Sequence, residues 1–347
     1  MLSLPVEKID GLFEAIAAQE KLYIPVDNSS GKANFSLWQK GARLSDALKT
    51  VRSAKDFFFP KTEHLVSYKI DGKQITVEDP RKDVEDFVLF GVRACDAKSF
   101  SIIDDVYLNM TPVDSYYKNR RDHGTVITLA CSEPDKTCFC PVYGIDAANP
   151  AGDISAWKAD GAFHFEANTD KGRKLLDSVK SLLSESDGKA VESAKKEIAA
   201  KLDKLLFAHL DLSKFAGKDM LRIFNSKIWD SVSEACLGCG TCTYVCPTCM
   251  CFDVRDFDTG SGIRQVRCWD SCMYSDFTQM AAENPRHTQK ERSRQRFMHK
   301  LVYYPMAHGG TFSCVGCGRC LESCPVNMNI VKVIKAINEE SGTTEEQ

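Results

Sequence analysis

The feature that most constrains this chain is a cysteine pattern that occurs twice in its C-terminal third. Both copies read C-x₂-C-x₂-C-x₃-C-P; the first holds Cys236, Cys239, Cys242 and Cys246, and the second holds Cys314, Cys317, Cys320 and Cys324. This is the spacing of bacterial two-cluster ferredoxins, in which three thiolates bind one [4Fe–4S] cluster and the fourth binds the neighbouring cluster. The repeat therefore predicts two [4Fe–4S] clusters.

The fourth cysteine of each copy is expected to cross to the other cluster. One cluster would be bound by Cys236, Cys239, Cys242 and Cys324, and the other by Cys314, Cys317, Cys320 and Cys246. Structural zinc is the alternative, but zinc usually takes two separated C-x₂-C pairs or mixed Cys and His ligands. Two dense runs of four cysteines favour iron–sulfur clusters, which the crossed arrangement holds close enough together for electron hopping.

Length and composition place the chain among ordinary globular proteins. Its 347 residues are enough for two domains, and its hydrophobic share of 43% and charged share of 27% are typical of such proteins. A net charge of −3 gives no reason to expect nucleic acid or an anionic membrane as the main partner.

The sixteen cysteines are best explained as metal ligands in a reducing compartment. The N-terminal residues have neither the basic nor the apolar region of a signal peptide. No apolar run approaches the roughly 18 residues that span a bilayer. We therefore expect a cytoplasmic chain without a membrane span or disulfides.

Two common nucleotide-binding motifs are absent from the sequence. It contains no G-x-G-x-x-G after a strand and no G-x₄-G-K-[ST]. We therefore expect no flavin or NAD in this chain, and any nicotinamide chemistry is assigned to another subunit.

The sequence pattern predicts an α/β domain in the N-terminal part. Apolar residues have helical spacing over 5–20, a short strand is predicted over 21–26, and 65–79 form a hairpin that turns at Asp71-Gly72. Two continuous apolar strands, 86–92 and 125–130, are separated by a helical segment. Such strands are expected to be parallel neighbours buried on both faces.

A further set of cysteines follows these two strands. Cys95 and Cys131 lie just beyond the strand ends, and Cys138 and Cys140 lie on the adjoining loop. Ligands of parallel sheets bind beyond the carboxyl ends of the strands. The four thiols therefore predict a third [4Fe–4S] cluster, with zinc or ordinary buried thiols as the alternatives.

The rest of the chain completes a two-domain prediction. A hairpin over 150–168, turning at Asp160-Gly161, precedes helical segments over 171–218, and a last short helix covers 329–338. The fold class is an α/β N-terminal domain followed by a mainly helical ferredoxin-like dicluster domain. The predicted boundaries are 1–227 for the first, 228–340 for the second and 341–347 for a disordered tail.

Two features of the C-terminal part, four additional cysteines and a basic stretch, allow more than one interpretation. Cys249, Cys251, Cys268 and Cys272 exceed the needs of the repeated motifs and could pack around the clusters, bind a further metal or form a redox pair. The packing role is favoured. The basic stretch 286–300 has no nucleic-acid recognition motif, so we assign it to charge compensation of the clusters or to an acidic partner.

With these residues in view, the chain resembles a family of dicluster iron–sulfur electron-transfer subunits. Sulfhydrogenase β subunits and an iron–sulfur subunit of anaerobic sulfite reductase are members of it. The ferredoxin runs are shared by many proteins, whereas the Ala-Cys-Asp, Cys-Phe-Cys and Cys-Pro-Thr-Cys-x-Cys segments are more specific. The blocks that carry the resemblance are 21–26, 57–60, 90–96, 105–108, 137–140, 236–251, 269–272 and 314–320.

The resemblance implies a subunit of anaerobic metabolism that transfers electrons from a flavin-containing, NAD(P)H-oxidising subunit to a catalytic subunit. That catalytic subunit would be a hydrogenase, a sulfite reductase or a heterodisulfide-reductase-like protein. The resemblance also supports the third cluster, and it implies a role for Cys249, Cys251 and Cys272 that it does not specify. Cys268 is an addition to the family pattern.

Three functional hypotheses follow. The first is a non-catalytic electron-transfer subunit of an oxidoreductase complex, with no catalytic residues of its own. The second is a stand-alone iron–sulfur enzyme or flavoenzyme that reduces a small substrate through its N-terminal domain. The third is a redox-sensing module with reversible thiol chemistry at the four additional cysteines. We favour the first, because the sequence shows no evident substrate pocket.

Overall fold

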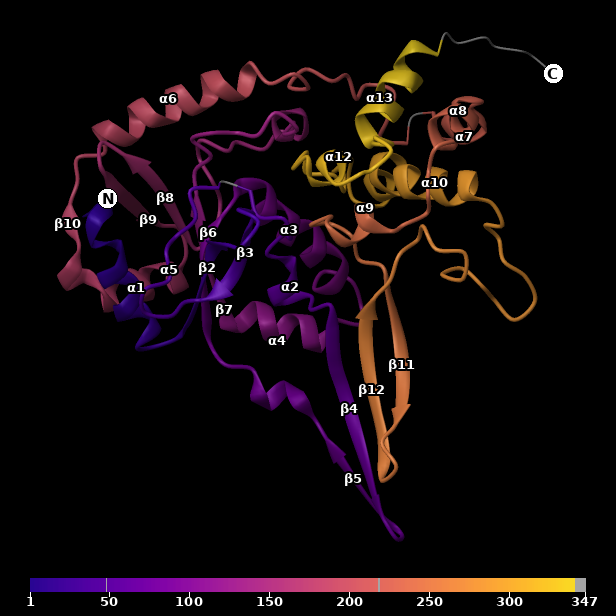
Figure 1. Cartoon of the computed structure of the whole chain (residues 1–347), viewed down its shortest axis with the longest axis horizontal. Helices are drawn as coiled ribbons and strands as arrows, with labels where there is room; N and C mark the ends of the chain where they lie inside the picture. Colours follow the sequence, from indigo (N-terminus) through magenta and orange to yellow (C-terminus); the bar gives the residue numbers. More distant parts are fainter. Residues whose placement is uncertain (48, 218, 341–347) are drawn as a thin grey trace.

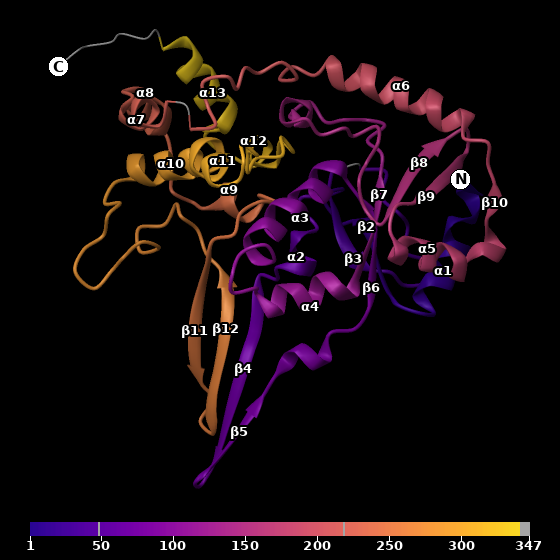
Figure 2. The same cartoon turned by 180° about the vertical axis from the view of Figure 1, so that it is seen from behind.

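The structure is a computed structural model that describes residues 1–47, 49–217 and 219–340. The predicted disordered tail, 341–347, lies outside these residues. Figure 1 shows a sheet domain with helices on both sides, a group of short helices beside it, and a narrow sheet that projects away from both. Figure 2 shows the same arrangement from behind.

The larger sheet is mixed, with a parallel centre. In the described part of the chain its eight strands are, in spatial order, β10 (Ser184–Glu185), β1 (Leu2–Pro5), β9 (Ala162–Ala167), β8 (Ile154–Ala159), β7 (Gly124–Leu129), β6 (Phe87–Val92), β2 (Lys21–Asp27) and β3 (Ala33–Leu37). Strands β2, β6, β7 and β8 are parallel, and the outer pairs are antiparallel.

The two central strands behave as the sequence predicts. Strands β6 and β7 pair in parallel, with Val88 opposite Thr125 and Leu89 opposite Val126. Every residue of both strands is buried.

The hairpin that turns at Asp160-Gly161 is confirmed as β8 and β9. The N-terminal prediction is wrong in part, because the chain forms β1 and a 3₁₀ turn (η1, Val6–Lys8) before its first helix.

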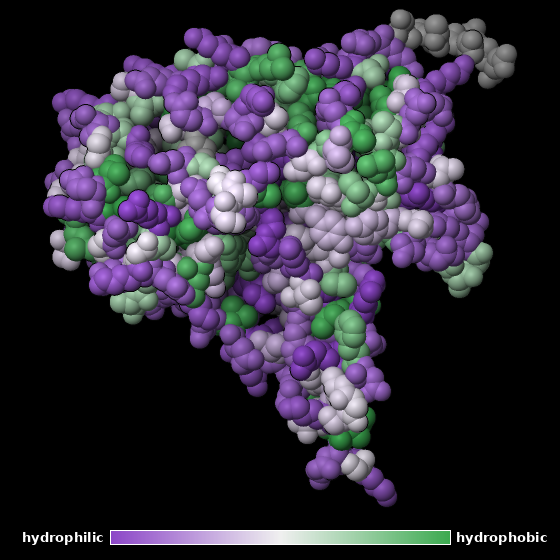
Figure 3. Space-filling model, in the orientation of Figure 1, coloured by the Kyte–Doolittle hydropathy of each residue, from purple (hydrophilic) through white to green (hydrophobic). Residues whose placement is uncertain are grey.

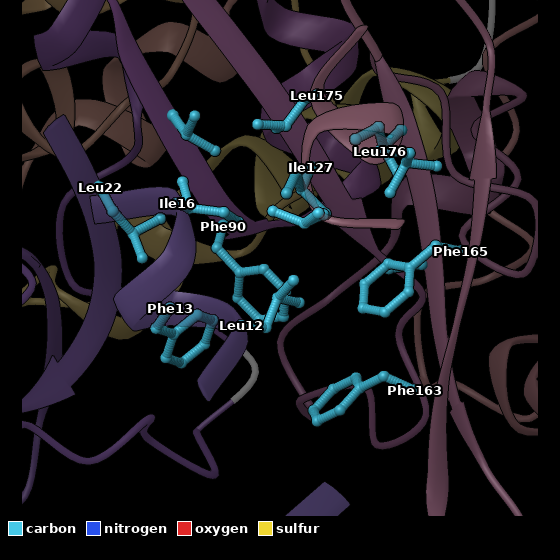
Figure 4. Packing of buried hydrophobic residues seen from close by; sticks show 14 of the residues in the cluster. Leu12, Phe13, Ile16, Leu22, Phe90, Ile127, Phe163, Phe165, Leu175 and Leu176 are labelled. Atoms are coloured by element: carbon cyan, nitrogen blue, oxygen red, sulfur yellow. The ribbon is translucent and has the colours of Figure 1, made fainter. Parts of the chain in front are cut away.

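Helices cover the two faces of this sheet. One face carries α1 (Ile9–Ala17) and α5 (Asp170–Ser178), and the other carries α2 (Lys55–Phe58), α3 (Ala94–Tyr107) and α4 (Ser115–His123). Figure 4 shows the first face, where side chains of α1 and α5 meet Phe90 and Ile127. Leu89 and Val92 of β6 belong to the core on the opposite face. Alternate residues of one strand therefore fill two cores, which explains why β6 is apolar throughout.

The second sheet joins distant parts of the sequence. Its order in the described residues is β11 (Phe252–Asp258), β12 (Gly262–Trp269), β4 (Thr62–Asp71) and β5 (Gln74–Glu78), and all neighbours are antiparallel. The hairpin predicted to turn at Asp71-Gly72 is confirmed as β4 and β5, but its two loop residues are Gly72 and Lys73, because Asp71 pairs with Gln74. The sequence did not predict the pairing of β4 with β12. We call this four-stranded sheet, which projects from the molecule in Figures 1 and 2, the arm.

The C-terminal part combines the β11–β12 hairpin with short helices, so its description as mainly helical is not confirmed. The helices of this part are α8 (Ile228–Ser233), α9 (Thr241–Tyr244), α10 (Gln289–Met298), α11 (Tyr304–Ala307), α12 (Arg319–Glu322) and α13 (Ile330–Glu339), with the π-helix η5 (His299–Tyr303). Before residue 228 the described chain also forms α6 (Lys189–Asp203) and α7 (Met220–Asn225), and the 3₁₀ turns η2 (Pro80–Asp83), η3 (Cys140–Tyr143) and η4 (Lys180–Leu182).

A separate hydrophobic core lies between α8, α10, η5 and α13. Trp229, Phe297, Leu301 and Ile334 are almost fully buried in it, and the predicted final helix is confirmed as α13. Helix α6 spans the top of the molecule in Figure 1 between the sheet domain and this helical group. Among the residues described, no helix combines the length and the apolar character needed to cross a membrane.

Candidate iron–sulfur centres

The cysteines of the second motif gather around one cavity. Cys314, Cys317 and Cys320 line it together with Cys246, the fourth cysteine of the first motif. Arg296 and Lys300 line the same cavity. The structure therefore brings Cys246 to the first three cysteines of the second copy, which is the grouping that crossed ligation requires.

The two motifs have the same local structure. In each, a glycine with positive φ precedes a four-residue helix that carries the third cysteine: Gly240 (φ 72°) before α9 and Gly318 (φ 74°) before α12. An L-residue with a side chain rarely adopts this conformation, which explains the glycines between the cysteines. The repeat in the sequence is thus a repeat in backbone geometry.

Lys300 places a buried positive charge beside Cys246. The residue is 7% exposed, and its ammonium donates hydrogen bonds to Thr248 Oγ1 (2.8 Å) and the Ser313 carbonyl (3.2 Å). Burial would raise the pKa of Cys246, but Lys300 and the hydrogen bonds from Thr248 outweigh it and lower that pKa. This environment favours a thiolate, the form that ligates iron.

Arg296 provides the clearest sign that an acceptor belongs in this region. Its side chain is buried, and within residues 1–47, 49–217 and 219–340 neither Nε nor Nη1 has a hydrogen-bond partner. Burial opposes the guanidinium charge, yet the thiolates of Cys242, Cys320 and Cys246 outweigh it and raise the pKa of Arg296. Buried N–H donors without acceptors are costly. The sulfide atoms of a [4Fe–4S] cluster are acceptors of the kind that these donors need.

The other predicted ligand set, Cys236, Cys239, Cys242 and Cys324, is partly or fully exposed. Gln289 donates to Cys236 Sγ (3.5 Å), and the backbone N–H of Met328 donates to Cys324 Sγ (3.2 Å). Hydrogen bonds from the Thr241 side chain and backbone lower the pKa of Cys239. Cys239 is the exposed cysteine among the sixteen. Donors to ligand sulfurs stabilise negative charge on a cluster and tune its potential.

The four N-terminal cysteines also converge. Cys95 lies in the first turn of α3, and Cys131 follows β7. Cys138 lies on the loop that leads into η3, and Cys140 is the first residue of η3. Burial raises the pKa of Cys138 to about 12; the nearby Lys49 ammonium opposes this rise, while Cys131 and Cys317 reinforce it. Burial likewise raises the pKa of Cys140, reinforced by Cys131 and Cys138.

The structure adds a neighbour that the sequence did not predict for this set. The Cys138 thiol lies 3.9 Å from the Cys317 carbonyl, and the Phe139 N–H donates to the Gly316 carbonyl (2.7 Å). A Cβ atom on Gly316 would lie 2.5 Å from the Phe139 carbonyl, and one on Gly318 would lie 2.3 Å from the Thr137 carbonyl oxygen. The loop with Cys138 and Cys140 therefore packs directly on the loop of the second motif.

A buried ion pair also joins the N-terminal set to the second motif. Arg319 of α12 and Asp96 of α3 are each 1% exposed, and the guanidinium binds the carboxylate through two hydrogen bonds of 2.6 and 2.7 Å. Arg319 Nε also donates to the Thr50 carbonyl (2.8 Å). Nothing in the sequence links these residues except that each stands beside a predicted ligand, Cys95 or Cys320.

Of the four additional cysteines, three contact one another and the fourth is Cys268. Cys249 and Cys272 each contact Cys251; the Cys249 contact lowers the pKa of Cys251, but the Cys272 contact and burial outweigh it and raise that pKa to about 12. Cys268 lies on β12 opposite Asp253, and the groups that act on its thiol are Arg255, Asp253 and Asp270 rather than another cysteine. In the described part of the chain, no group of three or more His, Cys, Asp or Glu side chains is placed to hold a single metal ion. Cys249, Cys251 and Cys272 thus form one group, which Cys268 does not join.

Comparison with known proteins agrees with this geometry. Residues 235–328 match the family model described as a 4Fe-4S dicluster domain, so the chain carries a domain for two [4Fe–4S] clusters. Over 297 residues the chain is 33% identical to sulfhydrogenase 2 subunit beta of Pyrococcus furiosus, and the alignment covers 85% of each chain. The chain therefore belongs to the family of this protein, that of dicluster iron–sulfur electron-transfer subunits.

The orphaned donors of Arg296 give a first prediction. Replacing Arg296 with glutamine removes a buried positive charge near Cys242, Cys246 and Cys320. A cation stabilises the reduced, more negative cluster, so its loss should shift the reduction potential to more negative values. We expect a shift of about 59 mV or more, equivalent to a tenfold change for one electron. Anaerobic redox titration followed by electron paramagnetic resonance measures the shift.

Arg294 provides the matched control for this prediction. It is two residues away on the same helix, and its guanidinium stacks on Phe224 and donates to the Phe224 carbonyl. Arg294→Gln should leave the potentials unchanged while removing the same formal charge. Equal shifts in both variants would mean that Arg296 acts only through the net charge of the chain.

Proposed function

We propose that this chain is the electron-transfer subunit of a cytoplasmic redox complex, and that it relays electrons between a flavin-containing, NAD(P)H-oxidising subunit and a catalytic subunit. The observation that carries the proposal is the succession of three cysteine sites. The N-terminal set packs on the loop of Cys317, the cavity of Cys317 includes Cys246 of the first motif, and the first motif reaches the surface at Cys239.

The proposed ligands are those that the sequence predicts. Cys236, Cys239, Cys242 and Cys324 bind one cluster, and Cys314, Cys317, Cys320 and Cys246 bind the second. Cys95, Cys131, Cys138 and Cys140 bind a third. Clusters at these sites supply one-electron oxidation and reduction. The protein's own contribution is to hold the three sites in succession and to exclude water from the N-terminal site and the site of the second motif. It also places Lys300 and Arg296 beside the cysteines of the second motif.

The surface end of this succession is well suited to exchange electrons with a partner. Cys239 is exposed, and the adjacent Leu237 is 68% exposed although it is apolar. A partner that covers Leu237 would bring its own redox centre close to the cluster of the first motif. Because tunnelling distance limits electron transfer, the exposed motif is the proposed exit or entry point.

The relative supports the choice of complex. It is named a subunit of a sulfhydrogenase, and a hydrogenase-type assembly is therefore the proposed setting, with a sulfite reductase or a heterodisulfide-reductase-like protein as other catalytic partners. In this proposal the chain itself binds no flavin or NAD and catalyses no net reaction. The proposed domain boundaries remain 1–227 and 228–340.

Anaerobic iron, sulfide and flavin quantification tests the proposal. We expect about twelve irons per chain and no flavin for three [4Fe–4S] clusters. Replacing Cys138 and Cys140 together with alanine should lower the iron content by about four per chain, because two ligands of the third cluster are lost.

Cys268→Ala is the control for this measurement, since Cys268 lies on the arm away from all three sites. It should retain the full iron content. About eight irons in the unmodified chain, with no further loss in the Cys138 and Cys140 variant, would reject the third cluster. Stoichiometric flavin in the isolated chain would favour the stand-alone enzyme instead.

A further inference from the structure

One face of the arm is apolar and exposed. Its outer part carries Tyr68 (38% exposed), Ile70 (48%), Ile75 (66%), Val77 (59%), Val254 (44%) and Ile263 (41%). We call these six residues the apolar face of the arm. Figure 3 shows hydrophobic side chains among polar ones along this projecting sheet.

The strand register shows that these side chains share one face. Ile70 pairs with Ile75, and Tyr68 pairs with Val77 and also with Ile263 across the other neighbouring strand. Directly opposite residues in antiparallel strands project to the same side of the sheet. Val254 shares this side, because it is an even number of residues from Asp258, the partner of Ile263.

The opposite face of β4 and β5 is polar. Thr76 and Gln74 alternate with Ile75 and Val77 and are exposed, Ser67 pairs with Glu78, and Lys69 forms an ion pair with Glu78. Alternation of this kind is the pattern of a sheet with one face packed and one face in water. The sequence of these strands is therefore that of a half-buried sheet, whereas their apolar face is open in the isolated chain.

The arm is held firmly at its base, where its charged side chains are buried. Arg267 of β12 forms ion pairs with Glu63 of β4 and with Asp114 at the start of α4. The Trp269 indole N–H donates to the Phe59 carbonyl (2.9 Å). The apolar face is thus presented by an anchored sheet, and β11 begins directly after Cys251, next to the cysteine sites.

The charge at the margin of this face indicates what kind of surface would fit it. Asp256 and Asp258 lie on β11 on the same side as Val254, along the outer edge of the arm. Arg267, the cation on that side of β12, is buried and already paired. A complementary surface would be apolar at its centre and would carry lysine or arginine where it faces β11.

We propose that the apolar face of the arm docks another subunit of the redox complex, through an apolar surface flanked by basic residues. The proposal rests on the proposed function, because it takes this chain to be a subunit, as its relative is named. Exposed contiguous apolar surface of this kind marks interaction sites. Docking on the arm would place the partner beside the β11 strand that leads from Cys251.

The test is made on the assembled complex, isolated from the source organism through an affinity tag on the full-length chain. Stoichiometric partner chains are identified by intact mass. Ile75→Lys with Val77→Lys introduces two charges on the apolar face, and Gln74→Lys with Thr76→Lys introduces the same two charges on the polar face. A third variant, Asp256→Lys with Asp258→Lys, reverses the charge at the margin.

We expect the Ile75 and Val77 variant to lower the ratio of partner to tagged chain at least tenfold, and the charge reversal to lower it as well. The polar-face control should retain the partner. The iron content per chain should be equal in all four proteins, which shows that the cysteine domain is folded. A failure of the proposed function would instead appear as missing or irreducible clusters in the unmodified chain.

Four outcomes would overturn the proposal. The first is equal retention of the partner by the apolar-face and polar-face variants. The second is isolation of the unmodified chain without a stoichiometric partner. The third is a dimer of the unmodified chain that the Ile75 and Val77 variant separates, which would assign the face to a second copy. The fourth is binding of the unmodified chain to anionic phospholipid vesicles that this variant loses.

Discussion

Arg319→Leu is expected to lower the free energy of unfolding by about 3–5 kcal/mol, the usual cost of leaving one partner of a buried ion pair uncompensated. Arg319 and Asp96 are each 1% exposed and are joined by two hydrogen bonds. After the substitution the Asp96 carboxylate keeps its burial but loses its counter-ion. Urea denaturation of the anaerobic protein, followed by circular dichroism, measures the loss.

Two controls separate the ion pair from other effects. Replacing Asp96 and Arg319 together with leucine removes both charges and should recover most of the loss, because an apolar pair carries no desolvation cost. Arg255→Leu removes an exposed arginine that pairs with Asp253 and should cost at most about 1 kcal/mol. If Arg319→Leu costs no more than Arg255→Leu, the ion pair does not hold the two parts of the chain together.

The second large effect is expected from Cys246→Ala. Cys246 lines the cavity of Cys314, Cys317 and Cys320. If it ligates the cluster of the second motif, its loss should remove about four irons per chain from that cluster. Iron analysis of double variants then identifies which cluster is lost.

The double variants have opposite expected results. Cys246→Ala with Cys314→Ala should lose no more iron than Cys246→Ala alone, since both thiols belong to one cluster. Cys246→Ala with Cys236→Ala should lose about eight irons, since these thiols belong to different clusters. The reverse pattern would mean that each motif binds its own cluster with four consecutive cysteines, and the crossed assignment would be wrong.

Local features of the fold were predictable from the sequence. The apolar runs 86–92 and 125–130 predicted β6 and β7 as parallel neighbours, and Asp71-Gly72 and Asp160-Gly161 predicted two hairpins. The strands and both hairpins are confirmed, with the first turn one residue later, at Gly72-Lys73. These predictions depend on residues close in sequence, where the side-chain period and turn chemistry decide the structure. The long helical segment predicted over 171–218 is interrupted between α5 and α6.

The arm shows why other features were not predictable. The alternation of β4 and β5 indicated a hairpin, but nothing local indicated that β12, far along the chain, pairs with β4. The strand β11 carries aspartates at positions 253, 256 and 258, so it lacked the continuous apolar signal of a buried strand. The pairing of β12 with β4 depends on the Glu63–Arg267 ion pair and on cross-strand contacts that only the folded chain forms.

The sequence by itself determined that the chain carries a domain for two [4Fe–4S] clusters, and it predicted the ligands, because a C-x₂-C-x₂-C-x₃-C-P run shapes its own loop around a cluster, with glycines where the backbone needs positive φ. Only the tertiary structure decided how the sites are joined. The packing of Phe139 on Gly316 and the Asp96–Arg319 pair each join residues far apart in the chain, and the fold buries Arg296 near Cys242, Cys246 and Cys320. Side-chain packing and buried charge set such contacts, and neither leaves a periodic pattern in the sequence.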